Sequence, residues 1–245
     1  MRPVEKWNPD NVNDIKENYP NYRDAKPLLC MNLGKVCSYC EKAYDDERDL
    51  HVEHIQPKNY KDSNGNYIYA HLKTAWSNFL LSCPTCNGTD NKDTKNVVYG
   101  ECHLPHINNT FLSLSYKAGG VVEVNPSLKG KSAANAHALL ELVGLNKSPK
   151  TSCPKDHRWK VRLEKWNLAT TFLKKYLNGT VDVETIIELA KGHGCWSIWF
   201  TVFKGHDDVL KALIEEFPGT AASCFDSNNH FEPICRNPDN AIDPV

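Results

Sequence analysis

The stretch that decides the fold begins with Cys37-Ser-Tyr-Cys40 and ends with Cys83-Pro-Thr-Cys86-Asn87. A Cys-x-x-Cys turn places two sulfurs on one side of a metal ion, and two such turns supply the four tetrahedral thiolates that a structural Zn²⁺ prefers. Such a site typically contributes about 10–16 kcal/mol of apparent binding free energy, which is enough to hold a short module together. Four cysteine ligands leave no position for water, so we expect this zinc to be structural.

The alternative for a Cys-x-x-Cys pair is a thioredoxin-like redox motif, which needs a strand–helix context around a single pair. It predicts a reversible disulfide between Cys37 and Cys40 and no bound zinc. Two pairs that flank one segment fit this context poorly. The other six of the ten cysteines are scattered, and we expect them to be small buried hydrophobic residues.

Length and composition exclude several classes of protein. The chain has 245 residues, which predicts one or two domains, and its 40% hydrophobic and 24% charged residues exclude disorder, collagen and coiled coil. No apolar run approaches the ~18 residues of a membrane helix, and the first residues lack the apolar core of a signal peptide. We therefore expect a cytoplasmic protein without membrane contact.

The net charge of −1 hides two oppositely charged segments. Residues 147–175 hold nine basic and two acidic residues, and a helix expected over 156–178 is either a nucleic-acid-binding face or a solvated one. Residues 182–245 hold eleven acidic and four basic residues, which favours a protein partner. Part of that docking surface is expected around residues 217–225, from the aromatic residues of this region: Trp196, Trp199, Phe200, Phe217 and Phe225.

Hydrophobic periodicity and turn residues predict the elements. Strands are expected over 50–55, 76–81 and 121–124. Residues 196–203 fit either a helix or a buried strand. Helices are expected over 10–18, 23–33, 132–144, 156–178, 182–191 and 206–217.

The residues that carry chemistry lie between the two cysteine pairs. Glu53 and His54 end a strand just before Pro57, and Asn78 and Asn87 follow. A carboxylate is a hard ligand for Mg²⁺ or Mn²⁺, and a histidine that titrates near neutrality can deprotonate water. Taken singly, each residue also has an ordinary structural role: a strand histidine on the surface or in the core, a turn asparagine, or a helix N-cap.

This combination resembles the HNH endonucleases of the ββα-metal fold. The matching residues are Cys37-Ser-Tyr-Cys40, His51-Val-Glu-His-Ile-Gln-Pro57, Trp76-Ser-Asn78-Phe-Leu and Cys83-Pro-Thr-Cys86-Asn87. The resemblance implies an α+β fold, a ββα-metal core stapled by a Cys₄ zinc site, with a mainly helical C-terminal half. We divide the chain into an N-terminal helical extension (1–36), a nuclease core with zinc knuckles (37–120) and a helical C-terminal region with possible partner docking (121–245).

The resemblance also implies roles for the site residues. His54 would be the general base, Glu53 and Asn87 would bind the catalytic Mg²⁺ or Mn²⁺, and Asn78 would pin the loop between the strands and so orient the base. The reaction would be phosphodiester hydrolysis that leaves 5′-phosphate and 3′-hydroxyl ends.

One departure concerns the segment after Asn87. The family often has a lysine three residues later, where this chain has Asp90 and its nearest lysine is Lys92. Asp90 or Asn91 is therefore a further candidate metal ligand. Candidate phosphate contacts are His51, Lys92 and Lys95, each with a solvated surface residue as the alternative.

A narrower resemblance extends to the HNH subunits of Septu-type and retron-associated antiphage defence systems. It rests on Met1-Arg-Pro-Val-Glu-Lys, Val124-Asn-Pro, Gly144-Leu-Asn and Phe217-Pro-Gly-Thr. It implies an ABC-type ATPase subunit as partner and nucleic acid as substrate, with DNA favoured over RNA. The alternatives are a stand-alone HNH restriction or toxin nuclease, and a zinc-stapled module that binds nucleic acid without cutting it.

Overall fold

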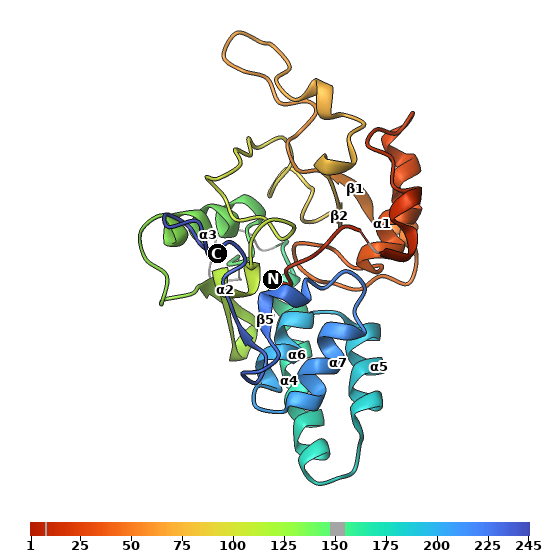
Figure 1. Cartoon of the computed structure of the whole chain (residues 1–245), viewed down its shortest axis with the longest axis vertical. Coiled ribbons are helices and arrows are strands. Elements are labelled where there is room, and N and C mark those ends of the chain that lie inside the picture. The colour runs from red at the N-terminus through yellow and green to blue at the C-terminus, as the bar shows by residue number, and fades with distance from the viewer. Residues whose placement is uncertain (8, 148–154) are drawn as a thin grey trace.

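The computed structural model describes residues 1–7, 9–147 and 155–245, with backbone only for 9–11. The chain combines antiparallel two-stranded sheets with helices, and the helices α3 to α7, between residues 130 and 215, follow one another without a strand among the described residues, which agrees with the expected α+β class. Figure 1 shows α1 (Lys26–Leu33) beside β1 and β2 at one end, and four helices, α4 to α7, at the other. In the part of the chain that the structure describes, no helix combines the length and apolar character needed to cross a membrane.

An antiparallel hairpin carries the residues between the cysteine pairs. β1 (His51–His54) pairs with β2 (Phe79–Ser82), with Glu53 opposite Leu80 and His54 opposite Phe79. The first strand was expected within one residue at each end. The second begins later than expected, because residues 76–78 form a 3₁₀ helix (Trp76–Asn78). β2 is buried at every position, so it anchors the exposed start of β1 to the core.

The segment after β2 differs from a ββα-metal motif in its third element. Residues 83–95 fold as consecutive turns and bends instead of an α-helix. The backbone N–H of Lys92 returns to the carbonyl of Cys86, which closes this segment into a compact loop. Pro84, Gly88 and the polar run between them disfavour a helix, since no apolar stripe is present to bury.

The middle of the chain forms α2 (Thr110–Ser113), a hairpin of β3 (Leu114–Lys117) and β4 (Val121–Val124), and α3 (Gly130–Val143). The helix α3 ends at Gly144, which has the left-handed conformation with φ of 58°. A Cβ there would clash with the Asn91 side-chain oxygen. Gly144 therefore lets the end of α3 approach the loop after the second cysteine pair.

The C-terminal half packs α4 (Arg158–Leu177), α5 (Val183–His193), α6 (Trp196–Val202) and α7 (Asp207–Glu215) together, followed by a hairpin of β5 (Phe225–Asp226) and β6 (Glu232–Pro233). The ambiguous stretch 196–203 is thus a helix. The expectation that aromatic rings form part of a docking surface around residues 217–225 is wrong, while docking by the acidic region 182–245 as such stays a prediction. The rings are core residues with at most 5% exposure: Trp196, Trp199, Phe200, Phe217 and Phe225.

One hydrophobic cluster connects the three predicted segments of the chain. The first residues of the chain connect distant segments by hydrogen bonds. The Arg2 guanidinium donates to the carbonyls of Leu33 and Pro218, and Val4 forms a β-bridge with Thr220. The predicted N-terminal extension therefore contacts the segment after α7, and its helix α1 packs against β2.

Candidate active site and metal centre

The four cysteines of the two Cys-x-x-Cys turns come together as expected. Their sulfurs all lie within 4.8 Å of one another, and all four residues are buried. A tetrahedral zinc with Zn–S bonds of about 2.3 Å separates its sulfurs by about 3.8 Å. The Cys40 and Cys83 sulfurs are 3.7 Å apart. The donor set and its spacing therefore fit zinc, and the backbone N–H of Ser38, which donates to the Leu81 carbonyl, ties the first turn to β2.

A buried arginine from α4 neighbours this cluster. Arg158 Nη1 lies 3.1 Å from the Cys86 sulfur, and Arg158 also donates to the Asp156 carboxylate and the carbonyls of Val143 and Gly144. A guanidinium close to a thiolate offsets part of its negative charge. Arg158 therefore links the cysteine cluster to the helical half of the chain.

The expected basic face of α4 is incomplete for this reason. Arg158 and Arg162 point inward, and Arg162 donates to the carbonyls of Gly120 and Leu145. These two guanidinium groups are buried and donate hydrogen bonds inside the fold, so they cannot contact phosphates. The surface cations that remain on this helix include Lys160 and Lys174.

The carboxylate of Glu53 lies at the floor of the site with 1% of its residue surface exposed. Lys92, which is fully buried, places its Nζ 2.5 Å from Glu53 Oε1 and 2.8 Å from the His54 carbonyl. Burial raises the pKa of Glu53, and the Lys92 ammonium opposes that rise. The expectation that Lys92 contacts phosphate is wrong, because its ammonium group is buried and paired with the Glu53 carboxylate.

The imidazole of His54 is held in one tautomer by the backbone. Nε2 lies 2.9 Å from the Lys73 carbonyl oxygen, and since a carbonyl only accepts, Nε2 carries the proton. Edge-on contacts with the Tyr22 and Phe79 rings fix the ring plane. Burial lowers the pKa of His54 to about 4. A neutral imidazole with Nδ1 unprotonated is therefore the stable form at neutral pH.

The segment that follows β1 is fastened by Asn78. Its side-chain oxygen accepts from the Gln56 N–H at 2.8 Å, and its amide donates to the Gln56 carbonyl at 2.9 Å and the Leu72 carbonyl at 3.3 Å. Its own carbonyl accepts from the Ile55 N–H. Asn78 thus fixes the backbone directly after His54.

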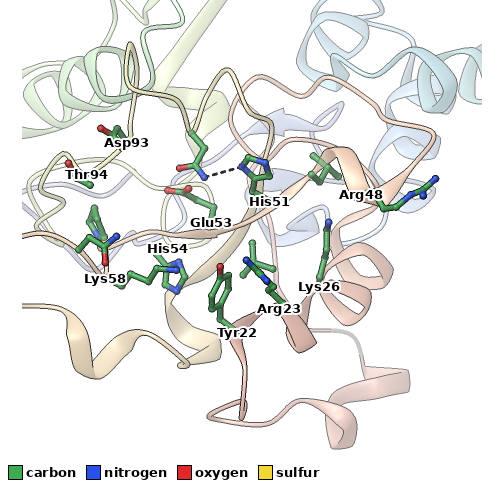
Figure 2. A pocket seen from close by; sticks show the side chains of 15 residues that line it. Tyr22, Arg23, Lys26, Arg48, His51, Glu53, His54, Lys58, Asp93 and Thr94 are labelled. Carbon is green, nitrogen blue, oxygen red and sulfur yellow. Dashed lines mark hydrogen bonds between the residues drawn. The ribbon is translucent and has the colours of Figure 1, made fainter.

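Asn87 and His51 meet at the mouth of the same site, with Asn87 Nδ2 and His51 Nδ1 3.4 Å apart (Figure 2). The further candidates Asp90 and Asn91 lie elsewhere: Asp90 does not line the cleft, and the Asn91 amide donates to the Thr85 carbonyl. Sequence reasoning missed Asp93, which lines the cleft and raises the pKa of Glu53 by its charge.

One open cleft of about 500 Å³ is lined by His51, Glu53, His54, Asn87 and Asp93. Glu53 and Asp93 supply hard oxygen donors and Asn87 an amide oxygen, which is a donor set suited to Mg²⁺ or Mn²⁺. Figure 2 shows Tyr22, Arg23 and Lys26 along one side of this cleft, on the N-terminal segment, with Glu53 and His51 across from them. Sequence reasoning missed these three residues because no local pattern connects residues 22–26 to β1.

Comparison with known proteins agrees with this geometry. Residues 37–93 match the family model described as HNH endonuclease. Over 121 residues, the chain is 29% identical to "Retron Vc95 putative HNH endonuclease" of Vibrio cholerae serotype O1 biovar El Tor. The aligned stretch covers 46% of this chain and 53% of that protein. Over 87 residues, it is 31% identical to "Septu protein PtuB" of Bacillus mycoides (strain KBAB4), which covers 33% of this chain and 30% of that protein.

The matched stretches thus span about half of the first relative and under a third of the second. The family match, by contrast, spans both cysteine pairs, the hairpin and the loop that carries Asn87, Lys92 and Asp93. Residues 37–93 of this chain therefore form an HNH endonuclease domain.

Proposed function

We propose that this chain is a metal-dependent endonuclease that hydrolyses phosphodiester bonds of nucleic acid. The single observation that carries the proposal is the state of His54. Its Nε2–H donates a hydrogen bond to the Lys73 carbonyl, and burial keeps the ring neutral. Nδ1 is therefore left to take a proton from water. This base lies in one cleft with Glu53, Asn87 and Asp93.

In this proposal each side chain has one task. His54 removes the proton from the attacking water, and Asn78 keeps the base in place by fixing the backbone of residues 55–56. Glu53 and Asn87 would hold the catalytic Mg²⁺ or Mn²⁺. A divalent cation at such a site stabilises the negative charge that develops at the phosphate. Attack in line with the leaving 3′ oxygen gives 5′-phosphate and 3′-hydroxyl ends.

We also infer that the Cys₄ cluster holds a structural Zn²⁺. Supporting this are the sulfur spacing, the burial of all four cysteines and the Arg158 guanidinium beside Cys86. Zinc would join the loop before β1 to the loop after β2, and so bring Asn87 next to the strand that carries Glu53.

The biological setting we propose is antiphage defence in the cytoplasm, as an effector nuclease that works with an ABC-type ATPase subunit. The names of the two relatives support the setting, since one belongs to a retron and the other is a Septu protein. Co-expression with an ATPase encoded beside this gene tests the partnership: we expect a stable complex by size-exclusion chromatography. Separate elution of the two proteins would favour the stand-alone nuclease.

The activity itself is tested with supercoiled plasmid and with single-stranded RNA, each with and without 5–10 mM Mg²⁺, roughly the range that saturates a weak carboxylate site. We expect cutting only with the added cation, and DNA cut in preference to RNA. Glu53→Gln is the matched variant, because it keeps the side-chain size and removes the charge. Binding without any cutting would support the non-catalytic zinc-stapled module instead.

A further inference from the structure

We propose that Arg23 and Lys26, together with Lys58, form a phosphate clamp that holds the nucleic-acid backbone against His54. This inference rests on the proposed function and names the surface that binds its substrate. Arg23 and Lys26 lie outside residues 37–93, so the family match assigns them no part. All three line the same cleft as Glu53 and His54.

The clamp residues carry charge that the fold does not neutralise. Within the described residues, Arg23, Lys26 and Lys58 have no carboxylate within ion-pair distance. The other cation on the rim, Arg48, is paired with Asp46. These three cations therefore leave positive charge on the rim of the cleft that also carries Glu53 and the exposed Asp93. Positive charge at this place attracts a phosphate toward the proposed metal–carboxylate site.

Tyr22 connects these cations to the base. Its ring meets the His54 ring edge-on with centroids 4.9 Å apart, and the Lys58 Nζ lies 3.8 Å from the centre of the Tyr22 ring. The Arg23 guanidinium carbon is 5.6 Å from the same ring. Cation–π contacts of this kind hold two otherwise flexible side chains beside the catalytic imidazole, which lowers the entropy lost on binding phosphate.

Hydrogen bonds and ring contacts hold the N-terminal segment in place beside the cleft. A capping box closes the 3₁₀ helix Tyr22–Ala25, with the Asn21 side chain accepting from the Arg23 N–H and the Asp24 side chain accepting from the Asn21 N–H. Ahead of it, the Tyr19 ring packs on Trp76 and Phe79. This anchoring fixes the clamp to β2.

The clamp replaces α4 as the predicted nucleic-acid surface. Two of the cations expected on that helix are buried, and its exposed Lys160 and Lys174 line no part of the active-site cleft. A backbone bound along α4 would not be held at His54. Binding along Arg23, Lys26 and Lys58 places the neighbouring phosphates directly at the base.

The test compares two variants that each lose two positive charges. Arg23→Gln with Lys26→Gln removes part of the clamp, and Lys160→Gln with Lys174→Gln is the control on α4. Both are made in a His54→Ala background so that the substrate survives. Fluorescence anisotropy with a labelled DNA duplex measures the dissociation constant from 50 to 300 mM NaCl, which spans the range where screening changes strongly.

Each phosphate contact contributes about 0.9 to the slope of log K against log salt for duplex DNA, so the clamp variant should lower the slope by about 1.8. If the two proteins bind equally at 1 M salt, this corresponds to about 30-fold weaker binding at 0.15 M. The α4 control should keep the slope of its parent. Equal slopes for the clamp variant and its parent, or loss of slope only in the α4 control, would overturn the proposal.

Two controls separate this outcome from failure of the proposed function. Thermal unfolding should be nearly unchanged in both double variants, since the replaced side chains lie at the surface or on the rim of the cleft. If the wild-type chain cuts nothing but the clamp variant loses slope, the clamp stands and the nuclease proposal fails. If the wild-type chain cuts and the clamp variant binds like its parent, only the clamp fails.

Discussion

The buried ion pair between Lys92 and Glu53 offers a test with a magnitude that follows from the structure. The two charged atoms are 2.5 Å apart, and both side chains have at most 2% exposure. At an effective dielectric constant of about 20, two unit charges at this distance attract by about 6–7 kcal/mol, against which the loss of hydration of both ions must be set. Removing one partner of such a pair typically costs about 3–5 kcal/mol, because the other charge stays buried without compensation.

The perturbation is a double-mutant cycle of Lys92→Met, Glu53→Gln and the two together. Lys92→Met keeps most of the length of the side chain and removes its charge, and it also leaves the His54 carbonyl without its donor. We expect each single variant to lose about 3–5 kcal/mol of unfolding free energy. The double variant should lose less than the sum of the two, with a coupling energy of about 2 kcal/mol or more.

The assay is urea unfolding of the zinc-loaded protein in buffer without Mg²⁺, followed by circular dichroism. Additive losses, within about 0.5 kcal/mol, would refute the account of the ion pair. Added Mn²⁺ gives an independent check: a cation that binds near Glu53 should stabilise Lys92→Met more than the wild-type chain, because the competing ammonium is gone. Equal stabilisation of both proteins would contradict that reasoning.

Three further predictions concern single residues. Since burial lowers the pKa of His54 to about 4, the base stays unprotonated as pH falls through 6.5, so the acid limb of kcat/KM should lie below pH 6.5; a limb at 6.5 or above would contradict it. Cys83→Ser should abolish the one zinc per chain measured by mass spectrometry and unfold residues 37–93; a folded domain without zinc would disprove a structural zinc site. Asn78→Ala should cost about 1–3 kcal/mol for each buried group left unpaired, beginning with the Gln56 N–H, and lower kcat; an unchanged melting temperature would argue against its role as an anchor.

The parts of the fold that the sequence predicts well are those set by local spacing. The Cys-x-x-Cys turns converge as expected, and β1 lies where apolar and polar residues alternate. The resemblance to HNH endonucleases grouped Glu53, His54 and Asn87, and all three line one cleft. The turns at 83–95 were less predictable, because a short polar segment beside a metal cluster takes its shape from the cluster.

The parts that the sequence could not predict depend on partners far along the chain. From the sequence, Lys92 looks like a loop cation and Arg158 like a surface cation. The structure shows that Lys92 is paired with Glu53 and that Arg158 lies beside Cys86, and neither partner is close in sequence. Aromatic residues next to an acidic segment look the same whether they face a partner or a core. Trp196 and Phe225 face the core, since their rings pack against each other at 5.7 Å.

The measurement that tests the central claim most directly is plasmid cleavage by His54→Ala in the presence of Mg²⁺. Removing a general base typically lowers the rate by about 10²–10⁴-fold. We predict a loss in this range, with the fold, the zinc content and DNA binding close to those of the wild-type chain. His137→Ala is the control, because His137 is exposed on α3 and does not line the cleft. If His54→Ala keeps more than about a tenth of the wild-type rate, well above the range expected for loss of the base, His54 is not the base, and His51 becomes the next candidate.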